Sequence, residues 1–503
     1  MNEGILYPVD DSAVAPLSME AYSGSMMSMP WFGQIRGEAG PGVMTILETR
    51  ADAGIRVDRP LTGEQPLLCA WPFWEPSRGS LRYNRVARHV LFGAGGYVAQ
   101  AKRYRDHAQA QGLLTTLAEK RRRNPLVDAL VGTPHVWARY SDGWNDGEPE
   151  HDPVRLIAEM KGLGISRLLF NGDATPAATV EMNDRWPDVI SSRYNNFQDT
   201  WAPGKPAIAP YHEGYPEDLA LRPDGSHQGG WPWPENGVTH VGSYICSSRM
   251  TDHARRSIVP EQAYAPFRGR FLDTTGATPW LECHSPDHPQ SRSDDCASRN
   301  RMLEYVSGAE PGQLRLITGT ETGIDATVPG VHYYEGMLSL HAYMLPPNED
   351  LGDLGSPVTP TAEYLRYNAS PYYRVPLFEL VFHDCVQSTW WWGDSNGRIP
   401  ELWDGKDLVN ALYGTNPLFY LMGDGPNVWE KTKQRYARTY ETVCTWVHRI
   451  GYDEMLSHEF LTPDHTLQRT TWSSGWTCVA NWSREPQTVG ERTVPGLRFI
   501  TYQ

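Results

Sequence analysis

The sequence predicts an α/β fold: a (β/α)₈ TIM barrel with an N-terminal β-rich domain and a small C-terminal β-sandwich. Strand and helix patterns alternate over about 290 residues, from 135 to 422. Two of the strand candidates, residues 270–276 and 316–323, are short apolar runs that end abruptly in a carboxylate. No Gly-rich phosphate turn follows a strand, which disfavours a doubly wound sheet as the alternative.

The first part of the chain, residues 1–125, is expected to be the β-rich domain. Residues 42–49 and 67–74 are strand candidates, and Gly, Pro and Asp lie between them without helical periodicity. A helix is expected over residues 97–123, where apolar side chains recur at helical spacing: Val98, Ala101, Tyr104, Leu113, Leu114 and Leu117.

The barrel is expected over residues 126–430. Asp152 followed by Pro153 predicts a helix start, because Asp is a favoured N-cap and Pro is tolerated at the first helical position. Gly162 and Gly164 end that helix pattern. The expected strands are residues 134–140, 166–173, 206–213, 269–273, 313–321, 377–384 and 418–422.

The last part, residues 431–503, is expected to hold a helix and the β-sandwich. The helix pattern covers residues 434–450 and ends at Gly451. Residues 467–472 and 476–482 are β runs joined by a Ser-Gly turn, which predicts a hairpin. Residues 499–502 would close the sandwich.

The amino-acid composition indicates which classes of ligand and which cellular compartment suit this chain. The formal charge of −15 disfavours a nucleic-acid partner, which would require a basic face. The 19 Trp and 25 Tyr exceed the 12 Phe, and rings with a polar group suit sugar faces as well as protein cores. The chain shows no signal peptide and no run of 18 apolar residues, so we expect a cytoplasmic protein without a membrane partner; a secreted protein lacking its leader would read the same.

The seven cysteines predict neither a zinc cage nor a disulfide framework. Their number is odd, they are scattered, and no CxxC occurs. Cys283 and His284 with Cys296 could suggest a metal, but their spacing matches no standard site. Metal ligands therefore stay unassigned.

The expected strand ends bring candidate site residues to one face of the barrel, because catalytic residues of this fold lie at the carboxyl ends of its strands. Asp173 could equally form an Asx turn or cap a helix, His383 with Asp384 could be a core pair, and at most two of the three tryptophans 390–392 can line a site. The substrate-binding candidates are Asn171, Asp173, Tyr211, His212, His383, Asp384, Trp390, Trp392 and Asp394.

Asp273 and Glu321 are the candidate catalytic pair. Asp273 interrupts an apolar strand and precedes Thr-Thr-Gly, and Glu321 lies within Gly-Thr-Glu-Thr-Gly, where small neighbours leave space. Two carboxylates on successive strands are the groups that glycoside hydrolysis requires.

These segments resemble glycoside hydrolase families 101 and 129, the α-N-acetylgalactosaminidase families, and their bacterial relatives. The N-terminal sheet region, the helix at 101–105, the strand ending at Asp173, and the tail segments 467–472 and 479–482 are also similar, so the resemblance covers most of the chain. It implies a retaining mechanism with Asp273 as nucleophile, on the fourth strand, and Glu321 as acid/base, on the fifth. The α-anomer and a galactose- or N-acetylgalactosamine-like sugar also come from the resemblance alone.

The predicted function is therefore retaining hydrolysis of an α-linked sugar by double displacement, with no required cofactor. Some relatives resemble calcium-dependent enzymes, which leaves calcium open. Two alternatives remain: a catalytically inactive carbohydrate-binding barrel, and a metal-dependent hydrolase or lyase that uses His212, His383 and nearby acids on a polysaccharide.

Overall fold

The computed structural model describes residues 4–5, 18–22, 24, 27–58, 69–138, 152–172, 174–205, 214–339, 357–362, 364–422 and 426–503. Its centre is a parallel eight-stranded sheet in the order β18-β16-β15-β14-β10-β9-β8-β19. The Asn416 amide donates to the Ser388 carbonyl oxygen over 2.9 Å, which joins the two edges of the sheet. The barrel strands are β8 (His135–Trp137), β9 (Leu168–Phe170), β10 (Val189–Asn195), β14 (Gly269–Leu272), β15 (Ile317–Glu321), β16 (Tyr333–Glu335), β18 (Gln387–Thr389) and β19 (Leu418–Tyr420).

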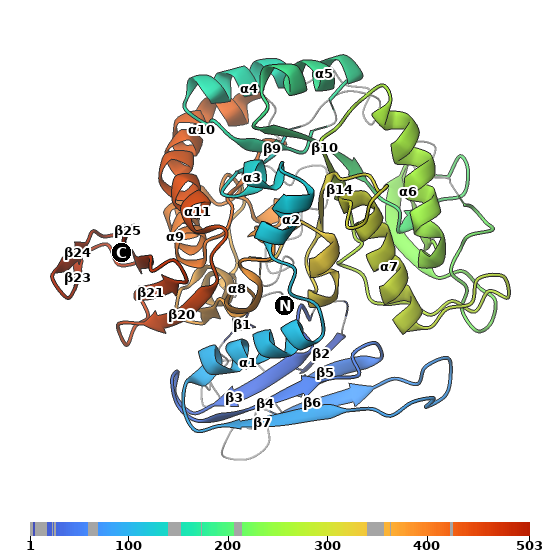
Figure 1. Cartoon of the computed structure of the whole chain (residues 1–503), viewed down its shortest axis with the longest axis horizontal. Helices are drawn as coiled ribbons and strands as arrows, with labels where there is room; N and C mark the ends of the chain where they lie inside the picture. Colours follow the sequence, from blue (N-terminus) through green and yellow to red (C-terminus); the bar gives the residue numbers. More distant parts are fainter. Residues whose placement is uncertain are drawn as a thin grey trace.

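Helices surround this barrel, which confirms the predicted fold class (Figure 1). Asp152 caps α4 as expected, because its carboxylate accepts from the amides of Val154 and Arg155. None of the helices in the described ranges is long and apolar enough to cross a bilayer. The helical elements are α4 (Pro153–Gly162), α5 (Pro176–Arg185), α6 (Ser247–Gln262), α7 (Arg292–Ser307), η1 (Asp325–Gly330), η4 (Tyr364–Ala369), α8 (Leu377–Phe382), η5 (Trp392–Asp394), η6 (Pro400–Leu402), α9 (Trp403–Tyr413), α10 (Pro426–Thr439), η7 (Tyr440–Cys444) and α11 (Thr445–Ile450).

The N-terminal region forms two small antiparallel sheets, and helix α1 lies between them and the barrel (Figure 1). The strands are β2 (Ser18–Tyr22), β5 (Ala53–Asp58) and β6 (Cys69–Trp74) in one sheet, and β3 (Trp31–Ile35), β4 (Gly42–Leu47) and β7 (Ala87–Phe92) in the other. The helices that follow are α1 (Gly96–Ala110), α2 (Leu117–Arg123) and α3 (Val127–Leu130). The strands at 42–49 and 67–74 are thereby confirmed.

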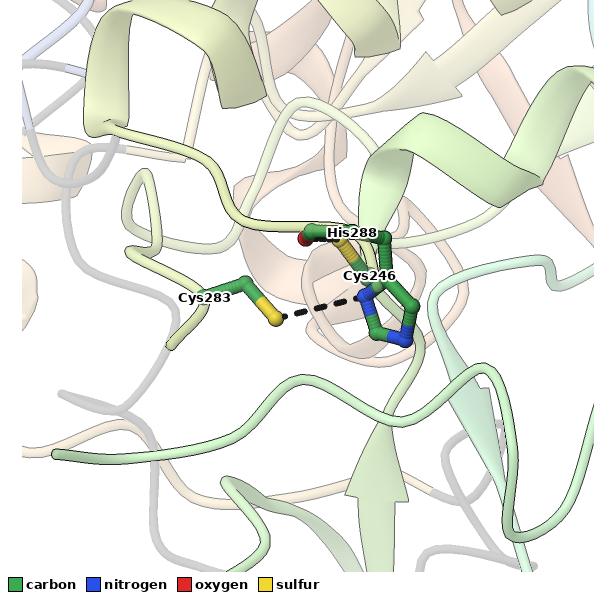
Figure 2. Close-up of side chains that lie close together, drawn as sticks. All are labelled: Cys246, Cys283 and His288. Carbon is green, nitrogen blue, oxygen red and sulfur yellow. Dashed lines mark hydrogen bonds between the residues drawn. The ribbon is translucent and has the colours of Figure 1, made fainter. Parts of the chain in front are cut away.

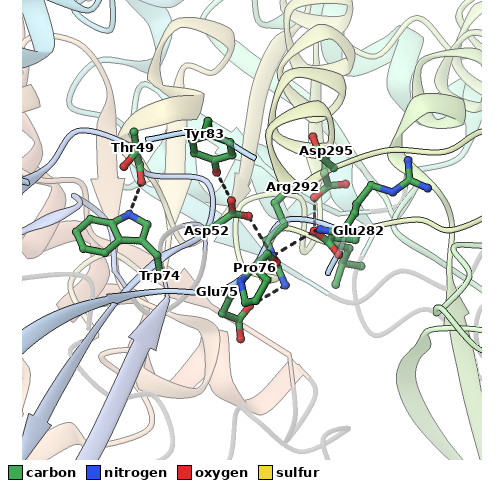
Figure 3. A network of polar contacts seen from close by, with 12 residues as sticks. Thr49, Asp52, Trp74, Glu75, Pro76, Tyr83, Glu282, Arg292 and Asp295 are labelled. Atoms are coloured by element: carbon green, nitrogen blue, oxygen red, sulfur yellow. Dashed lines mark hydrogen bonds and ion pairs between the residues drawn. The ribbon is translucent and has the colours of Figure 1, made fainter. Parts of the chain in front are cut away.

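An ion-pair network fastens this region to the barrel (Figure 3). Arg292, at the start of α7, pairs with Asp52 at 3.0 Å and Glu75 at 2.7 Å. It also pairs with Glu282, in the loop that follows β14, at 3.3 Å. One guanidinium therefore joins the N-terminal sheet to the carboxyl side of the barrel.

Smaller sheets complete the molecule. The predicted hairpin is present as β21 and β22, within a four-stranded antiparallel sheet beside the β23–β24 hairpin. These strands are β20 (Met455–Phe460), β21 (Leu467–Trp472), β22 (Thr477–Asn481), β23 (Gln487–Val489), β24 (Arg492–Val494) and β25 (Arg498–Tyr502). The others are β1 (Gly4–Ile5), β17 (Arg374–Val375), β11 (Asp199–Thr200), β12 (Gly229–Glu235) and β13 (Val238–Tyr244). The domain boundaries at 125 and 430 stay predictions.

Two element predictions are wrong. The helix expected over 97–123 is two helices, because Gly112 adopts a φ of 72° and Thr116 with Glu119 forms a capping box that starts α2. The strand expected at 377–384 is helix α8, a buried apolar segment that periodicity alone does not distinguish from a buried strand. The strand expected at 206–213 lies outside the described residues. The third barrel strand is β10, which was not predicted, and neither were β16 and β18, each only three residues long.

Candidate active site

Asp273 and Glu321 lie side by side at the carboxyl ends of the fourth and fifth barrel strands. The parallel register pairs Leu272 with Thr320, so the next residue on each strand is a carboxylate. The two carboxyl groups are near enough for the charge of Glu321 to act on Asp273. The Tyr194 hydroxyl donates to Asp273 Oδ2 over 2.5 Å, and Asp273 is only 8% exposed. The structure therefore brings these two predicted residues together at the carboxyl face of the barrel.

The electrostatics of the pair favour keeping one proton on it. Burial, followed by the charge of Glu321, raises the pKa of Asp273 well above its ordinary value. Burial likewise raises the pKa of Glu321. Two carboxyl groups close together in a water-poor site cannot both ionise cheaply, so the pair titrates as one unit that retains a proton to higher pH than a free carboxylic acid.

The backbone turns sharply behind each carboxylate. Thr274 has a φ of 57° and Thr322 a φ of 46°, in the left-handed region that β-branched residues strongly disfavour. Thr322 is held there by its amide, which donates to the Glu335 carbonyl oxygen over 2.5 Å. Such strain persists only where the surrounding structure enforces it, and it is concentrated at functional sites. In this chain it immediately follows both members of the pair.

Trp391 positions Glu321. Its indole Nε1 donates to Glu321 Oε1 over 2.9 Å, and its amide donates to Ser339 Oγ over 3.0 Å. The Ser339 hydroxyl donates in turn to Asp394 Oδ2 over 2.8 Å. Asp394 is 1% exposed, and it also accepts from Tyr364, Asn368 and Lys406. Asp394 therefore supports Glu321 through Ser339 and Trp391 instead of contacting it.

Glu335 is a third carboxylate at this face, and it was not among the residues predicted from the sequence. It is fully buried at the end of β16 and accepts from Trp137 Nε1 over 2.8 Å and Asn171 Nδ2 over 2.9 Å. Trp392 Nε1 donates over 2.5 Å and His135 Nδ1 lies 3.1 Å away. Its negative charge raises the pKa of Glu321. The strand that it ends is only three residues long, which gives too short a pattern to predict it from the sequence.

Asp199 is a fourth buried carboxylate, in β11 just beyond the end of β10. Its Oδ2 accepts from the Trp231 amide over 2.6 Å, and its Oδ1 has no donor within the described part of the chain. Burial, with a smaller contribution from the charge of Asp273, raises its pKa to about 6. It was missed because the strand before it was not recognised.

Aromatic side chains form one wall of this site. The Trp137 ring lies 5.1 Å from the Trp392 ring, and Phe271 lies 5.5 Å from Trp392. Trp391 and Trp392 are partly exposed and stack on one another, with centroids 6.4 Å apart. The wall therefore presents polar indole N–H groups to Glu321 and Glu335, and apolar rings beside them.

The structure does not bring every predicted residue to this face. Trp390 is 1% exposed and its indole donates to Asn410, so it packs in the core, and Trp391 replaces it at the site. His383 and Asp384 precede β18 instead of following a strand, because their segment is helical. They therefore lie at the amino-terminal end of the barrel, where Asp384 pairs with both Arg105 guanidinium nitrogens at 2.8 Å.

Of the remaining predicted substrate-binding residues, some lie at the carboxyl face and others lie outside the described residues. Asn171, Trp392 and Asp394 lie at the carboxyl face, around Glu335 or behind Trp391. Asp173, Tyr211 and His212 lie outside the described residues, so their roles stay predictions. Among the described side chains, the one group close enough to hold a metal is not made of these carboxylates; it is Cys246, Cys283 and His288.

Known proteins share the fold of this chain, and a known family matches part of it. Residues 355–471 match the family described as glycosyl hydrolases related to GH101 family, GH129, which confirms the predicted resemblance. No curated protein matches the chain. The α-N-acetylgalactosaminidase NagBb from Bifidobacterium bifidum, in complex with GalNAc, is similar in structure with a TM-score of 0.73 at 20% identity, over 95% of this chain and 77% of that one. The GH36 alpha-galactosidase AgaA from Geobacillus stearothermophilus gives a TM-score of 0.51 at 10% identity, over 97% of this chain and 71% of that one.

Proposed function

We propose that this chain is a glycoside hydrolase, a retaining enzyme acting on an α-linked galactose- or N-acetylgalactosamine-like sugar; the family match over residues 355–471 and the similar barrel support this proposal. The observation that carries the proposal is the position of Asp273 and Glu321, which directly follow paired residues at the carboxyl ends of two adjacent barrel strands. The sugar and its anomer rest on likeness, since the similar structures are an α-N-acetylgalactosaminidase and an alpha-galactosidase.

In the first step Asp273 attacks the anomeric carbon. The bond from that carbon to the leaving oxygen breaks, and Glu321 gives its proton to this oxygen. The products are a glycosyl ester on Asp273, the free alcohol and an ionised Glu321. The shared proton of the pair suits this step, because one carboxyl must be ionised while its neighbour is protonated.

In the second step water hydrolyses the ester. Glu321, now ionised, accepts a proton from the attacking water as its oxygen bonds to the anomeric carbon. The bond to Asp273 breaks, and both carboxyl groups return to their starting protonation states. Two inversions at one carbon leave the anomeric configuration unchanged.

The spacing of the pair supports retention over inversion. An inverting enzyme holds its carboxyl groups roughly 6.5–9.5 Å apart to admit a water molecule, whereas a retaining one holds them about 5–5.5 Å apart. Asp273 and Glu321 follow directly paired residues on adjacent strands, which favours the shorter separation. A nucleophile on the fourth strand and an acid/base on the fifth also match the families that the sequence resembles.

Sugar hydroxyl groups would meet the other polar side chains of this face. Asp199 is the strongest candidate, because its buried Oδ1 can accept a hydrogen bond from a substrate hydroxyl. Asn171 and Trp392 are held by Glu335 and would shape the pocket wall, and Asp173, Tyr211 and His212 are proposed to complete it.

Both steps balance without a cofactor, so EGTA-treated enzyme is expected to keep its activity. A loss of activity that Ca²⁺ restores would show a calcium requirement.

A fluoro-glycoside inactivator tests the nucleophile. We expect it to label Asp273 in peptide mapping, and Asp273→Asn to lower kcat/KM for a nitrophenyl α-glycoside by about 10⁴-fold. Asp252→Asn, on the exposed surface of α6, is the matched control and should keep full activity. Labelling at Glu321 or Glu335 would overturn the roles proposed for the pair, and neither labelling nor turnover with any α- or β-glycoside would favour a sugar-binding barrel.

A further inference from the structure

Three buried side chains with metal-binding atoms meet outside the carboxylate site: Cys246, Cys283 and His288 (Figure 2). Their ligand atoms, two sulfurs and an imidazole nitrogen, all lie within 4.8 Å of one another. The two cysteines are fully buried and His288 is 7% exposed. Neither His284 nor Cys296, the neighbours that the sequence suggested for Cys283, belongs to this cluster.

We propose that this cluster is a Zn²⁺ site that fastens the loop after β14 to the start of α6. Thiolate and imidazole ligands are those that zinc prefers, and a Cys₂His set leaves a fourth position for a water molecule. Two thiolates and a neutral imidazole would also neutralise a divalent cation. The charge balance suits the buried location of the cluster.

The hydrogen bonds of His288 orient it as a ligand. Its Nε2 lies 3.0 Å from the Glu217 carbonyl oxygen, which can only accept, so Nε2 carries the proton. Nδ1 is therefore left with its lone pair, and it lies 3.4 Å from the Cys283 sulfur. An imidazole fixed by a backbone carbonyl, with its other nitrogen facing the ligand set, is the usual arrangement around bound zinc.

Each of the two sulfurs also has polar neighbours. Cys283 Sγ accepts from the Leu221 amide over 3.5 Å. Cys246 is the N-cap of α6, and its Sγ lies 3.3 Å from Ser248 Oγ and 3.5 Å from the His288 carbonyl oxygen. A cysteine pair could instead form a disulfide, but that interpretation leaves the orientation of His288 unexplained.

The position of the cluster gives the ion a structural role. Cys283 and His288 lie in the loop that begins at Asp273 and ends at the Ser291 cap of α7. Cys246 starts the neighbouring helix, so the ion would join two separate connections at the carboxyl side of the barrel. It would hold in place the loop that follows Asp273.

Metal analysis of the purified full-length chain tests the proposal without any activity measurement. Elemental mass spectrometry is expected to find about one zinc per chain. Cys283→Ser and His288→Ala should each reduce zinc to a small fraction of that value. Cys296→Ser, at a partly buried cysteine outside the cluster, should retain it.

A second measurement uses the wild-type chain, so it tests the proposal even if the variants fail to fold. Wild-type chain produced with Co²⁺ should show the thiolate-to-cobalt charge-transfer absorption that a Cys₂His site requires. Zinc-free protein with free thiols at both cysteines, or a disulfide between Cys246 and Cys283 found by peptide mapping, would overturn the proposal. Because zinc content is independent of turnover, either result would leave the hydrolase assignment standing.

Discussion

Buried ionisable side chains have different surroundings at the two ends of the barrel. At the carboxyl end, Asp199, Asp273, Glu321 and Glu335 bring like charges together, and Asp199 Oδ1 has no donor within the described residues. At the amino-terminal end, buried Lys120 and Asp384 each meet groups of complementary polarity.

Lys120 is the clearest example at the amino-terminal end. It is 3% exposed, and its ammonium group donates to the carbonyl oxygens of Val328, Val331 and Cys385 over 2.6–2.7 Å. Beside it, Arg105 forms a two-bond pair with Asp384. These contacts join α1 and α2 to the strands and helices that start at this end.

This difference suggests that the carboxyl end serves catalysis and the amino-terminal end serves folding stability. Like charges close together oppose folding, so they persist where the rest of the molecule holds them in place and function requires them. Fully satisfied charges need no substrate to complete them. Variants at the two ends should therefore separate changes in activity from changes in unfolding free energy.

The largest effect is expected at the carboxyl end, from Glu321→Gln. Because the amide cannot donate a proton to the leaving oxygen, kcat/KM for an alkyl glycoside should fall by about 10²–10⁴-fold. A nitrophenyl glycoside, whose leaving group needs little protonation, should lose far less in the first step. Stopped-flow assays of both substrates measure the contrast.

The stability of the same variant provides the control. The folded protein must hold a proton on this pair that the unfolded chain releases, so the amide should leave the unfolding free energy unchanged or increased, measured by urea denaturation. Equal activity losses with both substrates would contradict the acid/base role of Glu321.

At the amino-terminal end, Lys120→Met should do the reverse. The change leaves three buried carbonyl oxygens without a donor, so we expect the unfolding free energy to fall by about 2–4 kcal/mol. The kcat/KM of the folded enzyme should stay unchanged, since Lys120 lies at the far end of the barrel from Asp273. Lys431→Met, at an exposed lysine, is the matched control. A Lys120→Met enzyme that is stable but inactive would break the comparison between the two ends.

The sequence predicted the carboxylate pair but not its whole surroundings. Asp273 and Glu321 were recognisable because each ends a run long enough to identify as a strand. Glu335 ends a three-residue strand of two tyrosines and an acid, which is too short for periodicity to reveal. The segment 377–384 shows the same pattern of an apolar run before an acid, yet it is helical, so His383 and Asp384 lie at the opposite end.

The cluster of Cys246, Cys283 and His288 shows a second limit of prediction from sequence. Cys246 and Cys283 are brought together by α6 and the loop after β14, and sequence spacing does not encode that approach. Local spacing instead pointed to His284 and Cys296, because they are near in sequence. The fold class was predictable from alternation, whereas contacts between separate loops required the tertiary structure.

The smallest effect is expected from Trp391→Phe, which should change the pH dependence of kcat/KM and so compares two indole groups at the carboxyl end. The Trp391 N–H stabilises ionised Glu321 and lowers its pKa, so removing it should raise that pKa further above its ordinary value. Glu321 must be protonated to act as the acid, and the alkaline limb of kcat/KM against pH reports the loss of that proton. The limb should therefore move to higher pH. Trp392→Phe is the matched change, because that indole donates to Glu335, and it should move the limb less. An alkaline limb that stays in place in Trp391→Phe would mean that another group sets it.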